Sequence, residues 1–368
     1  MKNHNWHQEE QARFQVGDAF YNPQSKYVRD LGVLAAAVYR QEHGCLRVLD
    51  TLAGCGVRSL RYCHESQADY VWVNEGNHQH NHIIQKNLSL TIAPEKFKLT
   101  HQDAHRVFFQ CYLDRDYYDL VDVDCFGTAV PYLNTMLWAT KIGGLMYLTC
   151  TDGRTVTGHP PEKTVLAYNA IARSHPALQE QALRIIIGAA QQQAAAKGLG
   201  IQPVFSLFTG QTYRLMLRLV RKSQITTNNY GFLAYCRHCG NYQTSSWRKL
   251  NKVGCQCDRP AVTVSGAMWL DKLHDREQLQ RFTMLALQWH WYKIVELLNL
   301  MQAEIDFPPY FYTLREIGNR GKLDLPKKSS LIQALQDRGY QAAATHIEPQ
   351  AIKTNTNIET VVAIARDI

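Results

Sequence analysis

The segment "DVDCFGT", from Asp122 to Thr128, holds the residues best suited to chemistry, at the end of the apolar run "YYDLV". A carboxylate such as Asp124 can accept hydrogen bonds from a reacting amine and so orient it. A cysteine such as Cys125 can instead attack a base covalently. The ring of Phe126 offers a flat face on which a heterocyclic base can stack. The residue types alone leave open whether the carboxylate or the sulfur is the working group.

A second set of candidate residues follows three other predicted strands. Gly54 and Gly56, in "LAGCGVRSL", permit a tight turn that lets a ligand approach the backbone before a helix begins. Glu75 ends the next strand about 20 residues later, where a carboxylate can accept two hydrogen bonds from a ribose diol. Asp103 follows a third strand and can accept from an adenine amino group. Because these strand ends converge in a parallel sheet, the sequence predicts one nucleotide-type cofactor crevice.

Four cysteines in the second half of the chain are spaced like metal ligands. Cys236 and Cys239 are separated by two residues and Cys255 and Cys257 by one, which supplies four thiolates for a tetrahedral zinc ion. The tight second pair leaves two alternatives open, namely His238 as a ligand or no metal at all. The chain has 10 cysteines, and in a reducing compartment we expect thiols or metal ligands rather than disulfides.

Alternating apolar runs and amphipathic stretches predict the framework that positions these residues. Strands are expected at Leu46–Leu52, Tyr70–Glu75, Lys96–Thr100, Tyr117–Asp124 and Gly143–Thr149. A long helix over residues 177–198 then leads to a hairpin made of residues 201–208 and 212–221. The pattern predicts an α/β fold with a doubly wound, Rossmann-like parallel sheet. A parallel sheet closed by an antiparallel hairpin resembles that of S-adenosylmethionine-dependent methyltransferases.

The alternating pattern ends near Ile225, where we place a domain boundary. Residues 1–224 are expected to form the sheet domain, and residues 225–368 a second, α+β domain with the zinc site. In the second domain, residues 312–340 predict a helix, a turn and a helix with a basic surface that can follow phosphates. The cations of this surface are Arg315, Arg320, Lys322, Lys327, Lys328 and Arg338.

The composition is that of a folded protein of 368 residues. The formal net charge of +8 suits a polyanionic partner without requiring one. The first residues lack the apolar core of a signal peptide, and no run approaches the roughly 20 apolar residues that span a bilayer. We therefore expect a cytoplasmic protein with no membrane partner. No feature indicates an obligate protein partner.

Ordered motifs along nearly the whole chain resemble the tRNA (guanine-26-N2)-dimethyltransferase family. "FYNPQSKYVRDLGVL" is similar to its F-Y-N-P block followed by R-D-L, and "LAGCGVRSLRY" to its G-[IV]-R-x-L-R-Y loop. "DVDCFGT" resembles its D-x-D-P-F-G. "GAMWLDKLHD" and "THIEPQAIKTN" resemble its G-P-x-W and T-H-x-x-P-x-x-[IV]-K-T signatures. The resemblance implies an enzyme that transfers methyl groups from S-adenosylmethionine to N2 of guanine 26 of tRNA, with guanine 27 as a further candidate.

The resemblance also implies a role for each matching residue. Asp124 would be the catalytic aspartate and Phe126 the aromatic residue on which the base stacks. Lys353 would join the basic surface that holds tRNA. The residues that would bind S-adenosylmethionine are Arg29, Arg58, Glu75, Asp103 and Ala104.

Cys125 departs from the family pattern, which has proline at this place. Proline would stiffen the turn, whereas cysteine supplies the same backbone carbonyl but leaves the loop freer. Two alternative functions stay open. One is an RNA cytosine-5 methyltransferase that uses Cys125 as its nucleophile, and the other is a catalytically weakened protein that binds or folds tRNA.

Overall fold

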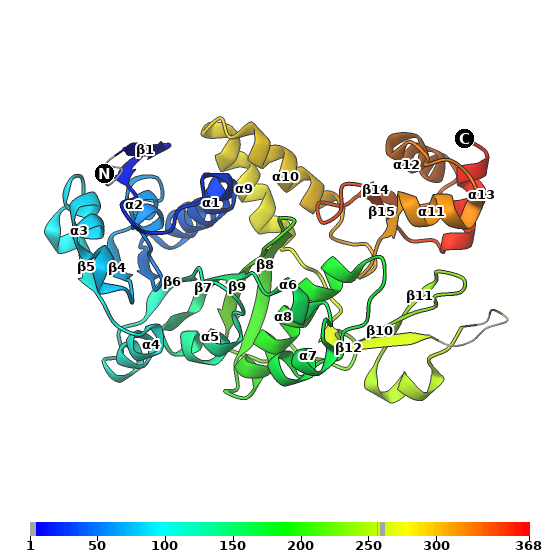
Figure 1. Ribbon diagram of the computed structural model, residues 1–368, viewed down its shortest axis with the longest axis horizontal. Coiled ribbons are helices and arrows are strands. Elements are labelled where there is room, and N and C mark those ends of the chain that lie inside the picture. The colour runs from blue at the N-terminus through cyan, green and yellow to red at the C-terminus, as the bar shows by residue number, and fades with distance from the viewer. Residues whose placement is uncertain (1–4, 256, 258–261) are drawn as a thin grey trace.

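The computed structural model describes residues 5–255, 257 and 262–368, and within them a seven-stranded mixed sheet lies at the centre (Figure 1). The strand order is β5-β4-β3-β6-β7-β9-β8. β3 to β7 run parallel, and β8 and β9 form an antiparallel hairpin at one edge. The strands are β3 (Arg47–Asp50), β4 (Tyr70–Asn74), β5 (Phe97–Thr100), β6 (Tyr118–Val123), β7 (Thr140–Cys150), β8 (Gly200–Phe208) and β9 (Tyr213–Val220). The predicted parallel sheet with its closing hairpin is confirmed.

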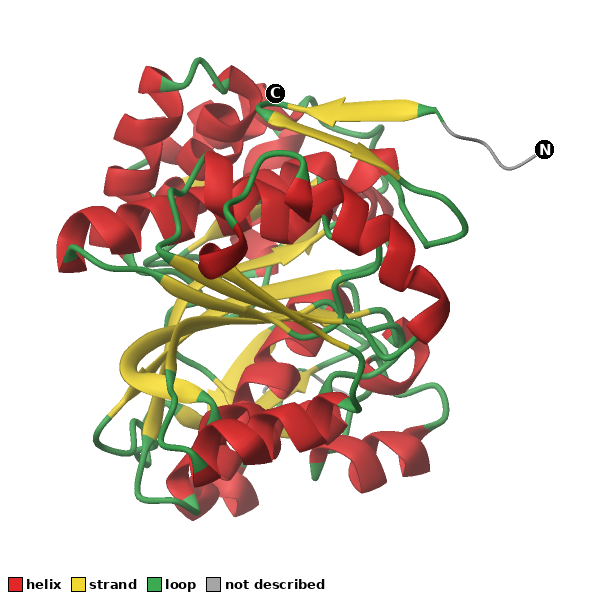
Figure 2. Ribbon diagram, turned by 90° about the vertical axis from the view of Figure 1, so that its left-hand side faces the viewer, coloured by secondary structure: helices red, strands yellow, loops and turns green. Residues whose placement is uncertain are grey.

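Helices cover both faces of the sheet (Figure 2). Successive side chains of a strand point to opposite faces, so Leu120 of β6 belongs to one core and Val121 to the other. Both are fully buried, and burial of a side chain of this size stabilises the fold by roughly 1.5–3 kcal/mol. The helices on the Leu120 face are α1 (Lys26–His43), α2 (Val57–His64), α3 (Asn81–Ser89), α9 (Arg276–Gln288) and α10 (Tyr292–Ala303). Those on the Val121 face are α4 (Ala104–Leu113), α5 (Val130–Thr135), α6 (Gly153–Val156), α7 (Pro161–Tyr168) and α8 (Leu178–Ala195).

The strand order reverses at β3, which lies between β4 and β6. From β3 the chain builds β4 and β5 on one side and then returns to add β6 and β7 on the other. The carboxyl ends of β3, β4 and β6 therefore border the crevice in which open parallel sheets of this kind bind ligands.

A short N-terminal hairpin, which the sequence did not predict, packs beside α2 and α3. Its strands are β1 (Trp6–Glu9) and β2 (Ala12–Gln15). The side chain of Asn87 holds this hairpin, because it accepts from Gln15 N and donates to Gln15 O, both at 2.8 Å. The 3-10 turns are η1 (Pro23–Ser25), η2 (His78–His80), η3 (Pro94–Lys96) and η4 (Met136–Trp138).

The rest of the chain forms two small sheets, with the strand orders β11-β10-β12 and β13-β15-β14. The first contains β10 (Tyr230–Tyr235), β11 (Tyr242–Ser245), the 3-10 helix η5 (Trp247–Lys252) and β12 (Thr263–Trp269). The second contains β13 (Tyr312–Thr313), α11 (Leu314–Gly321), α12 (Lys328–Asp337), β14 (Ala342–Ala344), β15 (Ala351–Thr354) and α13 (Ile358–Arg366), around a core of its own. The predicted pair of helices in residues 312–340 is confirmed as α11 and α12.

The large sheet ends shortly before the domain boundary that the sequence predicts after Gln224. However, α9 and α10 lie beyond this boundary and share the core of α1. The division of the chain into two domains remains a prediction.

In the described ranges, no helix is both long enough and apolar enough to cross a membrane.

Candidate active site and cysteine cluster

The glycine turn after β3 has the backbone geometry that its sequence predicts. Gly54 and Gly56 have φ values of 59° and 82°, which residues with a Cβ rarely adopt. Gly56 is the N-cap of α2. The carbonyl oxygen of Phe20 lies 3.5 Å from the position that a Cβ on Gly54 would occupy. The N-terminal segment therefore lies directly against this turn, with the Phe20 ring 82% exposed.

Glu75 is joined to the glycine turn by a hydrogen bond. Its Oε2 accepts from Gly54 N at 2.8 Å, and its Oε1 accepts from Asn77 N at 3.0 Å. Each carboxylate oxygen has two lone pairs, so each can accept a further hydrogen bond from a diol. The structure brings the predicted acid and the predicted turn together.

Asp103 and Ala104 lie at the start of α4, next to the end of β4. Asp103 is the N-cap of this helix, and its Oδ1 accepts from His105 N at 2.9 Å. Ala104 is buried. The ring nitrogen Nδ1 of His101 lies 2.8 Å from the carbonyl oxygen of Glu75, so the two strand ends adjoin. The capping role accounts for one oxygen of Asp103 and leaves Oδ2 available to a ligand.

Asp124 follows β6 and is held by two arginines from different elements. Arg58 Nε of α2 donates to Oδ2 at 3.0 Å, and Arg214 Nη1 of β9 donates to Oδ1 at 2.8 Å. Burial by itself would raise the pKa of Asp124, but the two guanidinium groups outweigh it and hold this pKa well below its usual range. The side chain is 28% exposed. Asp124 is therefore an ionised acceptor that a substrate can reach, and too weak a base to take a proton for long.

Two further carboxyl groups lie beneath Asp124 and are fully buried. Asp122 Oδ2 accepts from Tyr62 Oη at 2.6 Å and from Arg58 Nη1 at 3.0 Å. Asp50 accepts from Ser59 Oγ at 2.6 Å. Burial and the nearby Asp122 carboxylate raise the pKa of Asp50 to about 7. These groups support the strand ends, and Arg58 links them to Asp124.

Phe126 and Cys125 have opposite environments. Phe126 is 95% exposed, which leaves both faces of its ring free for stacking. Cys125 is buried, and its Sγ donates to Thr149 O at 3.0 Å. Burial raises the pKa of the Cys125 thiol to about 12, so the sulfur stays protonated near neutral pH. A buried, protonated thiol is poorly suited to attack a base.

The loop is held by hydrogen bonds two residues after Cys125, which stands where the family pattern has a proline. Gly127 has a φ of 82°; its N–H donates to Thr151 Oγ1 at 2.6 Å, and its carbonyl accepts from Thr151 N at 2.8 Å. Two hydrogen bonds to Thr151 restrict the turn at Gly127.

Arg29 lies in α1 and is buried. In the described part of the chain its hydrogen bonds go to Glu9, with Nε at 2.9 Å, and to the carbonyl oxygen of Asn22 at 3.0 Å. Arg29 therefore fixes the segment that covers the glycine turn. A direct contact of Arg29 with the cofactor remains a prediction.

Arg214 is the residue of this site that the sequence analysis missed. It lies in β9, which the sequence predicts only as one strand of the closing hairpin, and its backbone partner in β7 is Thr149. Its Nη1 donates to both Asp124 and Thr149 Oγ1. The available signal was an arginine within the apolar run "YRLML", since a buried charge in a strand needs a partner.

The four predicted cysteine ligands come together beside β10. Their sulfur atoms all lie within 4.8 Å of one another. The Cys236 and Cys257 sulfurs are 3.7 Å apart, and those of Cys239 and Cys255 are 3.2 Å apart. Around tetrahedral zinc, with Zn–S bonds of about 2.3 Å, neighbouring sulfurs would be about 3.8 Å apart. The donor set and its spacing fit a structural zinc ion with no free position for a substrate.

A second group of potential ligands, His274, Glu304 and His346, is buried where β8 meets the C-terminal segments. His274 Nδ1 accepts from Ser206 N at 3.3 Å, and burial holds the pKa of His274 well below its usual value. The ring is therefore neutral with its proton on Nε2, which faces Glu304 and has no lone pair for a metal. We assign this group to a buried polar network rather than to a metal centre.

Lys353 belongs to the same network, and the prediction that it joins the tRNA-binding surface is wrong. Its side chain is 2% exposed. Its Nζ donates to Glu180 Oε1 at 2.7 Å and lies 3.7 Å from Glu304 Oε2. A buried ammonium group needs such partners, because without them its desolvation is not compensated. The lysine of this motif therefore joins the C-terminal segment to α8.

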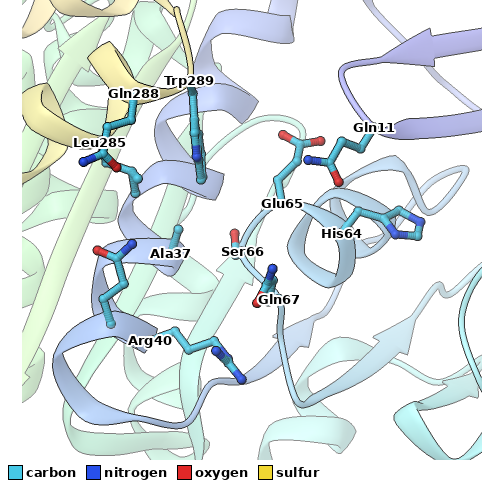
Figure 3. Close-up of a pocket in the computed structure, with 11 residues that line it drawn as sticks. Gln11, Ala37, Arg40, His64, Glu65, Ser66, Gln67, Leu285, Gln288 and Trp289 are labelled. Carbon is cyan, nitrogen blue, oxygen red and sulfur yellow. The ribbon is translucent and has the colours of Figure 1, made fainter.

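A cavity of about 290 Å³ lies between α1, α2 and α9 (Figure 3). Arg40, Ser66, Gln67 and Trp289 are among the residues that line it. Ser66 and Gln67 precede β4 and Arg40 precedes β3, so this cavity adjoins the amino ends of the strands. It is not part of the crevice that contains Glu75 and Asp124.

The fold and the crevice define a Rossmann-like, S-adenosylmethionine-dependent methyltransferase. The chain matches the family model described as N2,N2-dimethylguanosine tRNA methyltransferase over residues 4–366, and it belongs to this family. It is thus a tRNA methyltransferase that uses S-adenosylmethionine.

Relatives resemble the chain over nearly its whole length. The tRNA (guanine(26)-N(2))-dimethyltransferase of Thermococcus kodakarensis is 28% identical, and the match covers 95% of this chain and 93% of the relative. The enzyme of the same name from Pyrococcus abyssi is 25% identical, with 94% and 92% covered. The structure of Trm1 from Pyrococcus horikoshii in complex with S-adenosyl-L-methionine has a TM-score of 0.86 and 26% identity, and covers 98% of this chain and 99% of that one.

Proposed function

We propose that this enzyme acts in the cytoplasm on guanine 26 of tRNA, adding one and then a second methyl group to N2. The observation that supports this best is the pair formed by Asp124, an ionised and accessible acceptor, and Phe126, an exposed stacking ring two residues later. A flipped guanine stacked on Phe126 would present its N2 amino group to Asp124. Guanine 27 is a second candidate for the methylated base, because the same chemistry would serve it.

The crevice residues fit the methyl donor. The glycine turn at Gly54 lets a ligand approach the backbone, Glu75 can accept from a ribose diol, and Asp103 Oδ2 can accept from an adenine amino group. S-adenosylmethionine supplies an electrophilic methyl group on a sulfonium centre. We assign Arg58 to the same site. We assign Arg29 to it as well, because Arg29 fixes the segment that lies against the glycine turn.

Asp124 would act by orientation and charge rather than as a strong base. The N2 lone pair of guanine is delocalised into the ring, and a carboxylate that accepts an N2–H hydrogen bond draws that lone pair toward the methyl carbon. As the N–CH₃ bond forms, the methyl–sulfur bond breaks and its electron pair stays on sulfur. Positive charge develops on N2 beside the carboxylate, and the N2 proton then leaves to water, since the pKa of Asp124 is too low to keep it.

Nucleoside mass spectrometry of tRNA after reaction would test this proposal. With unmodified tRNA we expect N2-methylguanine and N2,N2-dimethylguanine at position 26, and no such product at that position after a G26→A change in the tRNA. A G27→A tRNA shows whether position 27 is also used. Methylcytosine as the product would favour the cytosine-5 alternative, and tRNA binding without any methylation would favour the binding-protein alternative.

A further inference from the structure

The 3-10 helix η5 carries an exposed aromatic ring beside exposed cations. Trp247 is 58% exposed, and Arg248, Lys249 and Lys252 of the same short helix are also exposed. We call these four residues the Trp247 surface. In Figure 1 they lie in the yellow-green helical turn next to β10 and β11. These residues belong neither to the active site nor to the four-cysteine cluster.

In the described part of the chain, no acidic side chain pairs with the cations of the Trp247 surface. Among the residues that the structure describes, none forms an ion pair or side-chain hydrogen bond with Arg248, Lys249 or Lys252. The sequence contains no Asp or Glu from Gln181 to Cys257. Such a surface attracts a polyanion.

The ring of Trp247 is fixed by the structure around it. It packs edge-on against Phe232 of β10, with ring centroids 4.6 Å apart and planes at 82°. The helix follows β11 directly and lies in the loop between Cys239 and Cys255, whose sulfurs meet. A ring held in this way loses little freedom when a ligand stacks on it.

Three of the six cations of the basic surface predicted in residues 312–340 are, by contrast, engaged with partners in the protein. Arg320 pairs with Glu316, and Arg338 pairs with Asp367. Lys328 donates to the carbonyl oxygen of Pro349 at 2.9 Å. Arginines with such partners have less charge to offer to phosphates. The Trp247 surface combines a stacking ring with three cations that pair with no residue in the ranges 5–255, 257 and 262–368.

We propose that the Trp247 surface binds the RNA of the tRNA substrate, at a region away from the base that is methylated. Trp247 would stack on a base or ribose, while Arg248, Lys249 and Lys252 contact phosphates. Figure 1 shows β10 and β11 at the opposite end of the long axis from β4 and β5, so this contact is remote from the cofactor crevice. The inference rests on the proposed function for the identity of the RNA.

Titration of labelled, unmodified tRNA with the full-length, metal-loaded protein at several salt concentrations would test this inference. For the triple variant Arg248→Gln, Lys249→Gln, Lys252→Gln we expect weaker binding and a shallower dependence of log Kd on log salt. The slope should fall by about one for each cation removed. For Trp247→Ala we expect binding weakened roughly 5- to 100-fold, with most of it restored in Trp247→Phe.

The matched control is the double variant Tyr292→Ala, Lys293→Gln, which removes an exposed ring and a neighbouring cation on α10. We expect it to bind tRNA as the wild type does. A triple variant with the wild-type affinity and salt slope would overturn the inference, whether or not guanine 26 is methylated. The inference would also be overturned if these residues were needed for binding to phosphatidylserine vesicles but not for binding to tRNA.

Discussion

Arg214 Nη1 lies 2.8 Å from Asp124 Oδ1, although 90 residues separate the two in the chain. With Arg58 on the other oxygen, Arg214 fixes the plane of the carboxylate and keeps it ionised. It is a positioning residue, because it acts through Asp124. The sheet makes this possible by placing β9 antiparallel to β7, which in turn lies next to β6.

Replacing Arg214 by glutamine should lower kcat for methyl transfer by about 10- to 100-fold, because the acceptor loses its orientation. Removal of one cation also raises the pKa of Asp124. The ionised form is then lost at a higher pH, so the acid limb of the pH–rate profile should move upward relative to that of the wild type. The other charged or titratable groups that interact with Asp124 are Arg58, Asp122, Asp50, Cys125 and Tyr147.

The control for this experiment is Arg218→Gln, four residues along the same strand, where the side chain donates to the carbonyl oxygen of Gly143. Its pH profile should match that of the wild type. If Arg214→Gln and Arg218→Gln behave alike, Arg214 has no positioning role.

Cys125→Ala should keep methyl transfer within about threefold of the wild type, because the thiol is protonated and only its surroundings change. The measurement is the rate with tRNA under saturating S-adenosylmethionine. Incubation with RNA containing 5-fluorocytosine should trap no covalent adduct. Complete loss of activity in Cys125→Ala, together with an adduct on the wild type, would show that the sulfur is the nucleophile.

The cysteine cluster should hold about one zinc ion per chain, as measured by metal analysis of purified protein. Cys239→Ser should lose the metal and lower the melting temperature, because the loop that carries η5 depends on the cluster. Cys45→Ser, at an exposed cysteine outside the cluster, is the control. Wild-type protein with far less than one metal ion per chain and the same melting temperature as Cys239→Ser would exclude a structural zinc site.

Lys353→Met should reduce the free energy of unfolding by about 3 kcal/mol, since the buried carboxylates of Glu180 and Glu304 lose the cation that they share. Arg184 stays beside Glu180 and His346 beside Glu304, which limits the loss. Urea denaturation measures this change. Lys322→Met, at an exposed site, should change it by less than about 0.5 kcal/mol. Equal effects of the two substitutions would contradict the buried network.

The sequence predicts the features that local patterns encode. Apolar runs ending in Glu75 or Asp124 identify parallel strands and their carboxyl ends, and Gly54 and Gly56 identify the turn, because only glycine tolerates those φ values well. The four cysteines are recognisable by spacing.

Long-range pairing explains what the sequence could not predict. Arg214 reaches Asp124 only through the register of β9 on β7, and Lys353 is buried by α8, which lies far away in the chain. A lysine in a polar segment gives no local sign of such burial. The same applies to α9 and α10, whose apolar faces show that they pack but not that α1 is their partner.

The most direct test of the central claim is the rate of methyl transfer to N2 of guanine 26 by Asp124→Asn, measured in single turnovers with saturating S-adenosylmethionine and unmodified tRNA. The substitution keeps the size of the side chain and removes the charge that would stabilise the developing cation. We expect the rate to fall by at least about 100-fold, with tRNA binding retained. A rate equal to that of the wild type would contradict the assignment of Asp124 as the working group.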